Sequence, residues 1–351
     1  MSSVSPSDAL PDHRRGGRAA PPGPARHAAG AEEVYAALDL GTNNCRLLVA
    51  RGAGAGFRVI DAFSRIVRLG EGLAATGLLS EAAMQRTLEA LKICAGKIDQ
   101  RGVTRARYVA TEACRRAGNC EAFLDRVQRT TGIAIETIST EEEARLAVAG
   151  CAPLLDRRKP YAIVFDIGGG STELVWLRLS PETARPRPDI LGSVSLPFGV
   201  VTFTERYGGD VIAPERYAAM VAEARSAMAP FAARHRVAEA LAAGAVQMLG
   251  SSGTVTTLAG IQLNLPRYIR SVVDGSILTF AAAEAISARL AAMPCAARAV
   301  HPCIGRERAD LVVAGCAILA AICALWPVGR LRVADRGVRE GILFSLLAAA
   351  A

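Results

Sequence analysis

The chain has 351 residues, of which 51% are hydrophobic and 5% aromatic, and its formal net charge is +8. A chain of this length can bury a sizeable core, and two lobes are expected rather than one. The longest uncharged stretch, residues 311–326 ahead of Pro327, is shorter than the roughly 20 residues that span a bilayer, so a buried helix is predicted there. The positive charge favours anionic partners, and it fits a solvated basic surface equally well.

Cysteine and histidine usage narrows the chemistry further. The nine cysteines are odd in number and include no Cys-x-x-Cys pair, which argues against a disulfide framework and against a zinc site. The four histidines are scattered, so a zinc triad or a Ser-His-Asp arrangement lacks material. A reduced, cytoplasmic protein without a membrane segment is the expectation.

The beginning of the chain differs in composition from the rest. Residues 1–32 are rich in proline and arginine and have no apolar h-region, so a disordered tail is predicted instead of a secretory signal. After it, residues 33–151 are predicted to form the first lobe and residues 152–351 the second.

The first lobe opens with two apolar runs around a polar turn, which predicts a β-hairpin. The remaining pattern is mixed α/β. Strands are expected at 34–40, 45–50, 57–69, 107–111 and 133–138, and helices from Ser80, at 121–131 and at 140–150.

The second lobe opens in the same way. An apolar strand ends near Asp166, three glycines make a turn, and the chain returns. Strands are expected at 161–167, 171–179 and 245–250, and helices at 214–235, 279–292, 308–326 and 338–349.

Each hairpin carries an aspartate at the end of its first strand and a tip of glycines or small polar residues. Glycines let backbone N–H groups approach phosphate oxygens, hydroxyls donate, and an aspartate can hold a cation. A single glycine triplet is more often just a tight turn, whereas a pair of such tips, one in each lobe, predicts a phosphate clamp.

Five stretches together resemble the exopolyphosphatase/pppGpp phosphohydrolase (Ppx/GppA) family, and the resemblance covers about residues 34–351. The second hairpin, Asp166 to Leu174 (DIGGGSTEL), is the most specific. The others are Asp39 to Leu47 (DLGTNNCRL), Thr111 to Asn119 (TEACRRAGN), Ile138 to Leu146 (ISTEEEARL) and Gly250 to Gly260 (GSSGTVTTLAG).

The resemblance implies the two-lobed actin-like ATPase superfold of sugar kinases, Hsp70 and actin, with ribonuclease H-like lobes and the active site in the cleft between them. It implies Mg²⁺-dependent attack of water on a terminal phosphoanhydride with a glutamate base, and Glu143 matches that glutamate. The residues alone also permit a capping box, in which Glu143 bonds the backbone N–H of Thr140.

The other site residues follow from the same match. Asp166 and Glu173 are candidates for Mg²⁺, with Asp39 as a third; either aspartate could instead cap a turn. Arg115 matches a family arginine that meets phosphate oxygens, although a lone arginine is more often solvated, and its neighbour Arg116 is the alternative. The Ser252 turn could bind an anion or simply cap a helix. The predicted phosphate-binding residues are Gly41, Thr42, Asn43, Asn44, Arg115, Gly168, Gly169, Gly170, Ser171, Thr172, Ser252, Gly253 and Thr254.

Two features depart from the family pattern, and two stretches are given structural roles. Thr42 and Asn44 stand where a Ser-Asn-Ser tip is usual, which keeps hydrogen-bonding capacity. Functions tied to the further C-terminal domains of long members are not expected. The stretches 307–310 and 335–341 look like family sequence, and structural roles are predicted for both.

Several functions remain open. The first expectation is exopolyphosphatase activity, and the alternative is hydrolysis of pppGpp, a guanosine pentaphosphate, to the tetraphosphate. An actin-like kinase, or a non-catalytic sensor of polyphosphate or ppGpp, would share the clamp. Nucleic-acid binding is not predicted because no basic stripe is interleaved with aromatic residues. A homodimer is suggested by family analogy alone.

Overall fold

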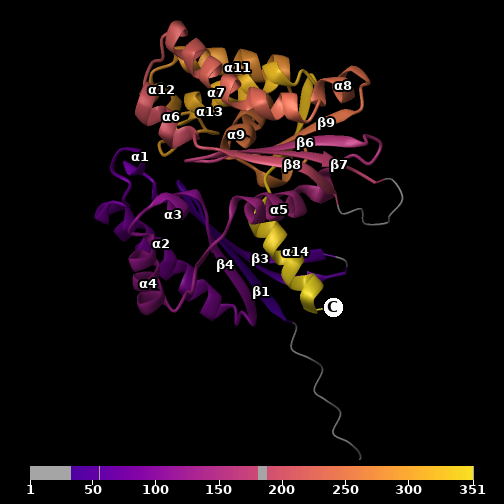
Figure 1. Ribbon diagram of the computed structural model, residues 1–351. Coiled ribbons are helices and arrows are strands. Elements are labelled where there is room, and N and C mark those ends of the chain that lie inside the picture. Colours follow the sequence, from indigo (N-terminus) through magenta and orange to yellow (C-terminus); the bar gives the residue numbers. More distant parts are fainter. Residues whose placement is uncertain (1–32, 55, 181–187, 351) are drawn as a thin grey trace, which may run out of the picture. The chain divides into compact units, whose positions relative to one another are not determined.

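The structure is a computed structural model that describes residues 33–54, 56–180 and 188–350. The tail predicted for residues 1–32 lies outside the described residues, and the lobe boundary after residue 151 stays a prediction. Within residues 33–350 the chain forms two mixed β-sheets with helices packed against them (Figure 1).

The first sheet has the strand order β3-β2-β1-β4-β5. The predicted hairpin is confirmed, since β1 pairs antiparallel with β2, while β4 runs parallel to β1 on its other side. The strands are β1 (Val34–Leu40), β2 (Asn44–Ala53), β3 (Gly56–Ile66), β4 (Arg105–Ala110) and β5 (Glu136–Thr137).

The second sheet repeats this arrangement in the order β10-β11-β9-β6-β7-β8. Strands β6 and β7 form the second predicted hairpin, and β9 runs parallel to β6 as β4 does to β1. The strands are β6 (Tyr161–Ile167), β7 (Thr172–Arg178), β8 (Asp189–Leu196), β9 (Val246–Ser251), β10 (Ile277–Thr279) and β11 (Arg330–Ala334). Strand β1 ends at Leu40 and strand β6 ends at Ile167, and the turn that follows each strand forms the tip of its hairpin.

Helices cover both faces of the first sheet. One face packs on helices α2 and α4 through buried side chains such as Leu40 and Phe123, and the other packs on α5 and α14 through Leu146 and Ile342. The helix predicted from Ser80 is α2, and Ser80 is its N-cap, accepting from the backbone N–H of Ala83. The helices are α1 (Leu73–Thr76), α2 (Glu81–Gln100), α3 (Glu112–Arg116), α4 (Cys120–Thr131), α5 (Thr140–Cys151) and α14 (Val338–Ala350).

The second sheet buries its larger core against a group of helices that includes α13, the uncharged stretch of the sequence. All its residues from Val312 to Leu319 are buried, so the prediction of a buried helix is confirmed. Within the described ranges no helix is both long and apolar enough to cross a membrane. The helices are α6 (Val200–Tyr207), α7 (Pro214–Arg234), α8 (Val237–Ala242), α9 (Gly253–Gln262), α10 (Arg270–Val273), α11 (Phe280–Ala292), α12 (Cys295–Ala299) and α13 (Val312–Leu325), with a 3-10 turn η1 at Ala152–Leu154.

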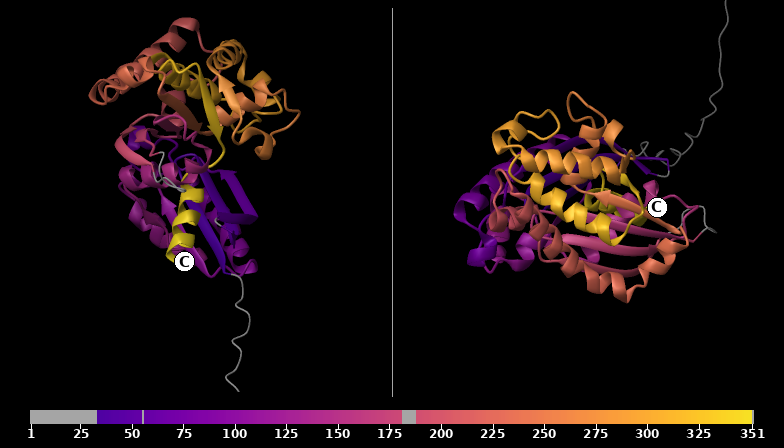
Figure 2. Two further views of the ribbon diagram at one scale, coloured as in Figure 1. Left: turned by 90° about the vertical axis from the view of Figure 1, so that its right-hand side faces the viewer. Right: turned by 90° about the horizontal axis from the view of Figure 1, so that it is seen from above.

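The last helix returns to the first sheet. After β11 the chain enters α14, which packs against β1 and α5, as the yellow helix beside the indigo strands shows (Figure 2). Two glycines allow α5 and α14 to approach closely, because a Cβ on Gly341 would lie 2.0 Å from the carbonyl oxygen of Leu146 and one on Gly150 would lie 2.0 Å from that of Gly337. Both connections between the sheets therefore run side by side.

Three predicted elements differ from the structure. The strand predicted at 57–69 ends at Ile66, because Arg68 adopts a left-handed conformation with φ 48° and the Val67 N–H bonds the Asn43 carbonyl instead of continuing the ladder. The strand predicted at 133–138 shrinks to the two residues of β5. The helix predicted at 308–326 starts only at Val312, and its first predicted turn is a loop. Strands β8, β10 and β11 were not predicted.

Candidate active site

The tips of the two hairpins lie against each other. The turns have the same closing bond, with the Gly41 N–H donating to the Asn44 carbonyl and the Gly168 N–H to the Ser171 carbonyl, both at 2.9 Å. At the contact, a Cβ on Gly170 would lie 2.8 Å from the Thr42 hydroxyl oxygen. Glycine is therefore required here by the close approach of the first tip.

A cavity of about 440 Å³ opens at the hairpin tips. It brings together most of the predicted site residues: Asp39, Gly41, Thr42, Asn43, Asn44, Glu143, Asp166, Gly168, Gly169, Ser171, Glu173, Ser252, Gly253 and Thr254. Three predicted phosphate-binding residues do not line it. Gly170 faces Thr42, the buried Thr172 donates its hydroxyl to the Phe198 carbonyl at 2.8 Å, and Arg115 is engaged with carboxylates.

Register places a different charge opposite each hairpin aspartate. Asp39 on β1 stands directly across from Arg46 on β2, whereas Asp166 on β6 stands across from Glu173 on β7. Opposed side chains of an antiparallel pair lie on the same face, about 4.5–5.5 Å apart at Cβ. The first hairpin therefore carries an opposite-charge pair and the second a pair of carboxylates.

Burial and mutual repulsion raise the pKa of the cavity carboxyls. Burial, reinforced by the charge of Asp166, raises the pKa of Glu173 to about 7, and burial raises that of Asp166 to about 7 although Arg46 opposes the shift. Burial also raises the pKa of Asp39, against the attraction of Arg46. Ionisation of these carboxyls inside the cavity is therefore unfavourable, and a bound cation would stabilise their charged forms.

Glu143 is the buried carboxylate at the start of α5. The helix is capped one residue earlier than the sequence suggested, because Ser139 is the N-cap and accepts from the backbone N–H of Glu142. The capping-box alternative for Glu143 is therefore wrong. Its side chain is 13% exposed, and burial together with the charge of Glu173 raises its pKa to about 8, with Arg115 opposing.

Arg115 holds Glu143 in place. Its Nη1 donates to Oε2 of Glu143 at 2.7 Å and to the Ile138 carbonyl at 3.1 Å, while its Nε and Nη2 donate to Oε2 of Glu112 at 3.3 and 3.0 Å. The guanidinium bridges these two carboxylates. Burial by itself would lower the pKa of Arg115, but the two carboxylates outweigh burial, so the pKa is raised. Its phosphate contact stays a proposal, while its contact with Glu143 is a direct observation.

Helix α9 points its first turn at the cavity. Ser252 is the N-cap and accepts from the Val255 N–H at 3.0 Å, so the predicted cap is confirmed. The helix packs closely on α13, where a Cβ on Gly315 would lie 2.0 Å from the Thr254 hydroxyl. One turn further, the buried Thr257 hydroxyl belongs to a residue that lines the cavity, and it has no hydrogen-bond partner among the described residues.

Five arginines line the cavity that the sequence reasoning did not place in the site: Arg46, Arg270, Arg308, Arg336 and Arg339. Three of them, Arg308, Arg336 and Arg339, come from the stretches 307–310 and 335–341, for which structural roles were predicted. Arg339 is 9% exposed, and burial lowers its pKa and that of Arg308. In the sequence Arg308, Arg336 and Arg339 each stand beside an aspartate or glutamate, which could have marked them as candidates. Only the folded chain brings them to the hairpin tips.

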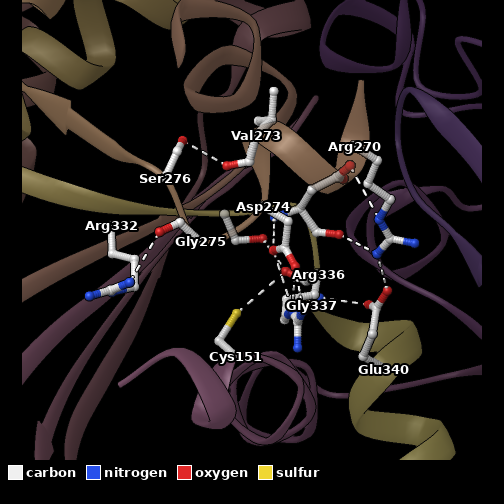
Figure 3. Close-up of polar contacts among 12 residues, drawn as sticks. Cys151, Arg270, Val273, Asp274, Gly275, Ser276, Arg332, Arg336, Gly337 and Glu340 are labelled. Carbon is white, nitrogen blue, oxygen red and sulfur yellow. Dashed lines mark hydrogen bonds and ion pairs between the residues drawn. The ribbon is translucent and has the colours of Figure 1, made fainter. Parts of the chain in front are cut away.

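Polar contacts at the junction between β11 and α14 hold Arg336 and, through Glu340, Arg270 of α10 (Figure 3). The Arg336 side chain pairs with Asp274, and its carbonyl accepts from the Ser251 hydroxyl at 2.8 Å. Glu340 accepts from the Gly337 N–H at 2.8 Å and from Arg270 at 2.7 Å. These contacts hold the part of the cavity wall that residues 335–340 form.

Comparison with known proteins assigns this arrangement. The model of the Ppx/GppA phosphatase family matches residues 48–350. The chain belongs to the Ppx/GppA phosphatase family. A solved family member from Aquifex aeolicus is 29% identical with a TM-score of 0.72, over 91% of this chain and 99% of that one. An exopolyphosphatase-like protein is 29% identical with a TM-score of 0.79, over 91% and 99%. An exopolyphosphatase from Cytophaga hutchinsonii shares the fold at 23% identity, with a TM-score of 0.80 over 90% and 98%.

Membership in the Ppx/GppA family confirms the predicted fold class, the actin-like ATPase superfold, with its two hairpin-led sheets. It also makes the chain a phosphatase whose site suits phosphoanhydrides.

The donor set of the cavity fits a magnesium ion. No group of three or more His, Cys, Asp or Glu side chains converges as a ready metal site within the described part of the chain. Mg²⁺ usually keeps several waters and is held by one or two carboxylates together with substrate phosphates, so such a group is not required. Asp166 and Glu173 supply hard oxygen ligands, and burial raises their pKa values in spite of the opposing charges of Arg46 and Arg115.

Proposed function

We propose that this Ppx/GppA protein hydrolyses terminal phosphoanhydride bonds and releases phosphate from inorganic polyphosphate. The observation that carries the proposal is the position of Glu143, a buried carboxylate that lines the same cavity as both hairpin tips and is held by Arg115. In this proposal the tips and arginines hold the phosphates, and Glu143 activates water.

The reaction follows from the roles of these groups. A water oxygen forms a bond to the terminal phosphorus while the bond from that phosphorus to its bridging oxygen breaks. The water proton passes to the Glu143 carboxylate, and the electron pair of the broken bond stays on the leaving phosphate chain. A base with a pKa near the working pH combines a useful ionised fraction with proton affinity, which suits the value of about 8.

The charge that develops on the phosphate oxygens is met by several donors. Backbone N–H groups at Gly169 and Asn43 lie at the tips, and the guanidinium groups of Arg46, Arg308 and Arg339 line the same cavity. Phosphoryl transfer depends mainly on positioning and on charge neutralisation of this kind. Asp166 and Glu173, with Asp39 as a third candidate, would hold Mg²⁺, which would neutralise phosphate charge when bound.

The test compares two glutamates of one helix. Glu143→Gln keeps the shape of the side chain but cannot take a proton, whereas Glu141→Gln alters an exposed residue two positions earlier. We expect Glu143→Gln to lower phosphate release from long-chain polyphosphate by about 10²–10⁴-fold, with binding of the chain retained. Glu141→Gln should retain nearly full activity.

Long-chain polyphosphate and pppGpp are assayed side by side with and without Mg²⁺. Faster release from polyphosphate supports the proposal, and faster release from pppGpp would make the chain a pppGpp phosphohydrolase. Binding of either compound without phosphate release from the wild type would indicate a sensor. Full activity of Glu143→Gln would remove Glu143 from the mechanism.

A further inference from the structure

Arg298 on α12 is an arginine with no exposed surface. Its guanidinium donates only to backbone carbonyls among the described residues, from three segments of the second sheet's helical layer. Nε donates to Ala309 at 2.7 Å, Nη1 to Leu290 and Met293 at 3.1 and 2.7 Å, and Nη2 to Gly209 and Asp210 at 2.6 and 3.2 Å. Each of the five N–H donors of an arginine thus has an acceptor.

This use of a charge is unusual, because a buried cation is normally paired with a carboxylate. Arg298 forms no salt bridge with a described residue. Two of its acceptors, Leu290 and Met293, stand at the end of α11, where the helix carries partial negative charge. The guanidinium is therefore stabilised by oriented carbonyls, and its donors tie the end of α11 to the two loops that contain Gly209 and Ala309.

The second of these loops carries two residues that act at the cleft. Ala309 lies between Arg308, which lines the cavity, and Asp310, which accepts two bonds of 2.9 Å from Arg68 of the first sheet. Arg68, which makes this contact, has a left-handed backbone conformation with φ 48°. The segment 308–311 departs from the helix that its sequence predicts, and the bond from Arg298 to the Ala309 carbonyl occupies an acceptor that a longer α13 would use.

The first loop is packed against the same segment. A Cβ on Gly209 would lie 2.9 Å from the Asp310 carbonyl oxygen, and the Gly209 carbonyl accepts from Arg298. The Cys295 N–H also donates to the Asp210 carboxylate at 2.7 Å. Arg298 therefore stands beneath both loops, and no other described side chain donates to both of them.

We propose that Arg298 is a positioning residue, which fixes the loop at 305–311 so that Arg308 faces the phosphate cavity. A lysine has three donors and cannot satisfy five carbonyls. Arg298→Lys keeps the charge and is therefore preferred to Arg298→Ala, which would strip every donor from the buried site. Met228→Ala, a buried change in the same core that lines no part of the cavity, serves as the control for lost packing.

The first measurement is hydrogen exchange without substrate, which tests the positioning by itself. The amides of Leu311 and Val312 both donate to the Arg308 carbonyl and report whether the loop is closed. We expect Arg298→Lys to speed their exchange about ten-fold or more, while the amides of α2 keep their rates. Equal exchange at these amides in Arg298→Lys and Met228→Ala would overturn the proposal.

The second measurement is kinetic and rests on the proposed function. We expect Arg298→Lys to raise KM for long-chain polyphosphate about ten-fold with kcat within about two-fold, as for an interaction made equally in the ground and transition states. If Arg298 acts through Arg308, the double variant with Arg308→Gln should have the KM of Arg308→Gln alone. If the rise in KM of the double variant is instead the product of the two single-variant rises, Arg298 does not act through Arg308.

Discussion

The two hairpins share one backbone plan and differ in the charge opposite the aspartate. In the first, Asp39 faces Arg46; in the second, Asp166 faces Glu173. The tips differ as well, since Thr42 and its neighbours carry side chains where the second hairpin has glycines. Equivalent positions in two similar sheets therefore carry an opposite-charge pair in one hairpin and a pair of carboxylates in the other.

Among changes to the two hairpins, the largest effect is expected from removing that difference. Glu173→Gln keeps the bond from the Ser195 hydroxyl, which is 2.9 Å long, but leaves Asp166 as a lone carboxylate. We expect phosphate release to fall by about 10²–10³-fold, as when one electrostatic contact to the reacting group is lost. Steady-state assays at several Mg²⁺ concentrations measure it.

Arg46→Gln is the matched change in the first hairpin. Because it removes one of several cations, KM for polyphosphate should rise about ten-fold and the requirement for Mg²⁺ should stay unchanged. If the two variants respond alike to Mg²⁺, the division of roles between the hairpins is wrong.

A smaller effect is expected at the contact between the tips. Gly170→Ala places a methyl group 2.8 Å from the Thr42 hydroxyl oxygen, so the tips must separate. We expect kcat/KM to fall about ten-fold, since small displacements of positioning groups are costly in catalysis. Gly96→Ala on α2, where an added Cβ meets nothing within 4 Å, should keep full activity. In a background of Thr42→Ala, which removes the contacted hydroxyl and methyl, adding Gly170→Ala should cause no further loss, and this would confirm the contact as the cause.

The smallest effect concerns stability and pH without divalent cations. The Glu143 pKa is raised to about 8 in the folded protein, so between its ordinary value of 4.5 and 8 the folded state binds more protons than the unfolded state. The free energy of unfolding should therefore decrease as pH rises through this window. We expect Tm to fall by about 2–4 °C between pH 5 and 8, and Glu143→Gln to lessen the fall.

The neighbouring residue provides the opposite sign. Hydrogen bonding to Arg145 lowers the pKa of Glu142 to about 2, so its stabilisation is present above pH 4.5 and is lost as pH falls toward 2. Glu142→Gln should therefore leave the fall of Tm between pH 5 and 8 unchanged. A wild-type Tm that rises from pH 5 to 8 would contradict the raised pKa of Glu143.

Local patterns predicted the elements whose formation depends on nearby residues. Both hairpins follow from apolar runs around turn residues, and α2 follows from Ser80 and its apolar spacing. The prediction failed where distant contacts decide the backbone. The first turn of α13 is favourable locally, but the Ala309 carbonyl accepts from Arg298 instead. The capping box at Thr140 failed for a local reason, because the neighbouring Ser139 caps α5.

The sequence by itself determined the two phosphate-type turns, with Asp39 and Asp166 at the ends of their first strands, because apolar runs around small residues form hairpins locally; the resemblance to the Ppx/GppA family singled out Glu143 and Glu173. Only the tertiary structure decided which cations meet them. Arg308 and Arg339 reach the cavity from segments far along the chain, carried there by the loop on Arg298 and by the return of α14 to the first sheet. Such convergence depends on packing between elements, and no short-range pattern encodes it.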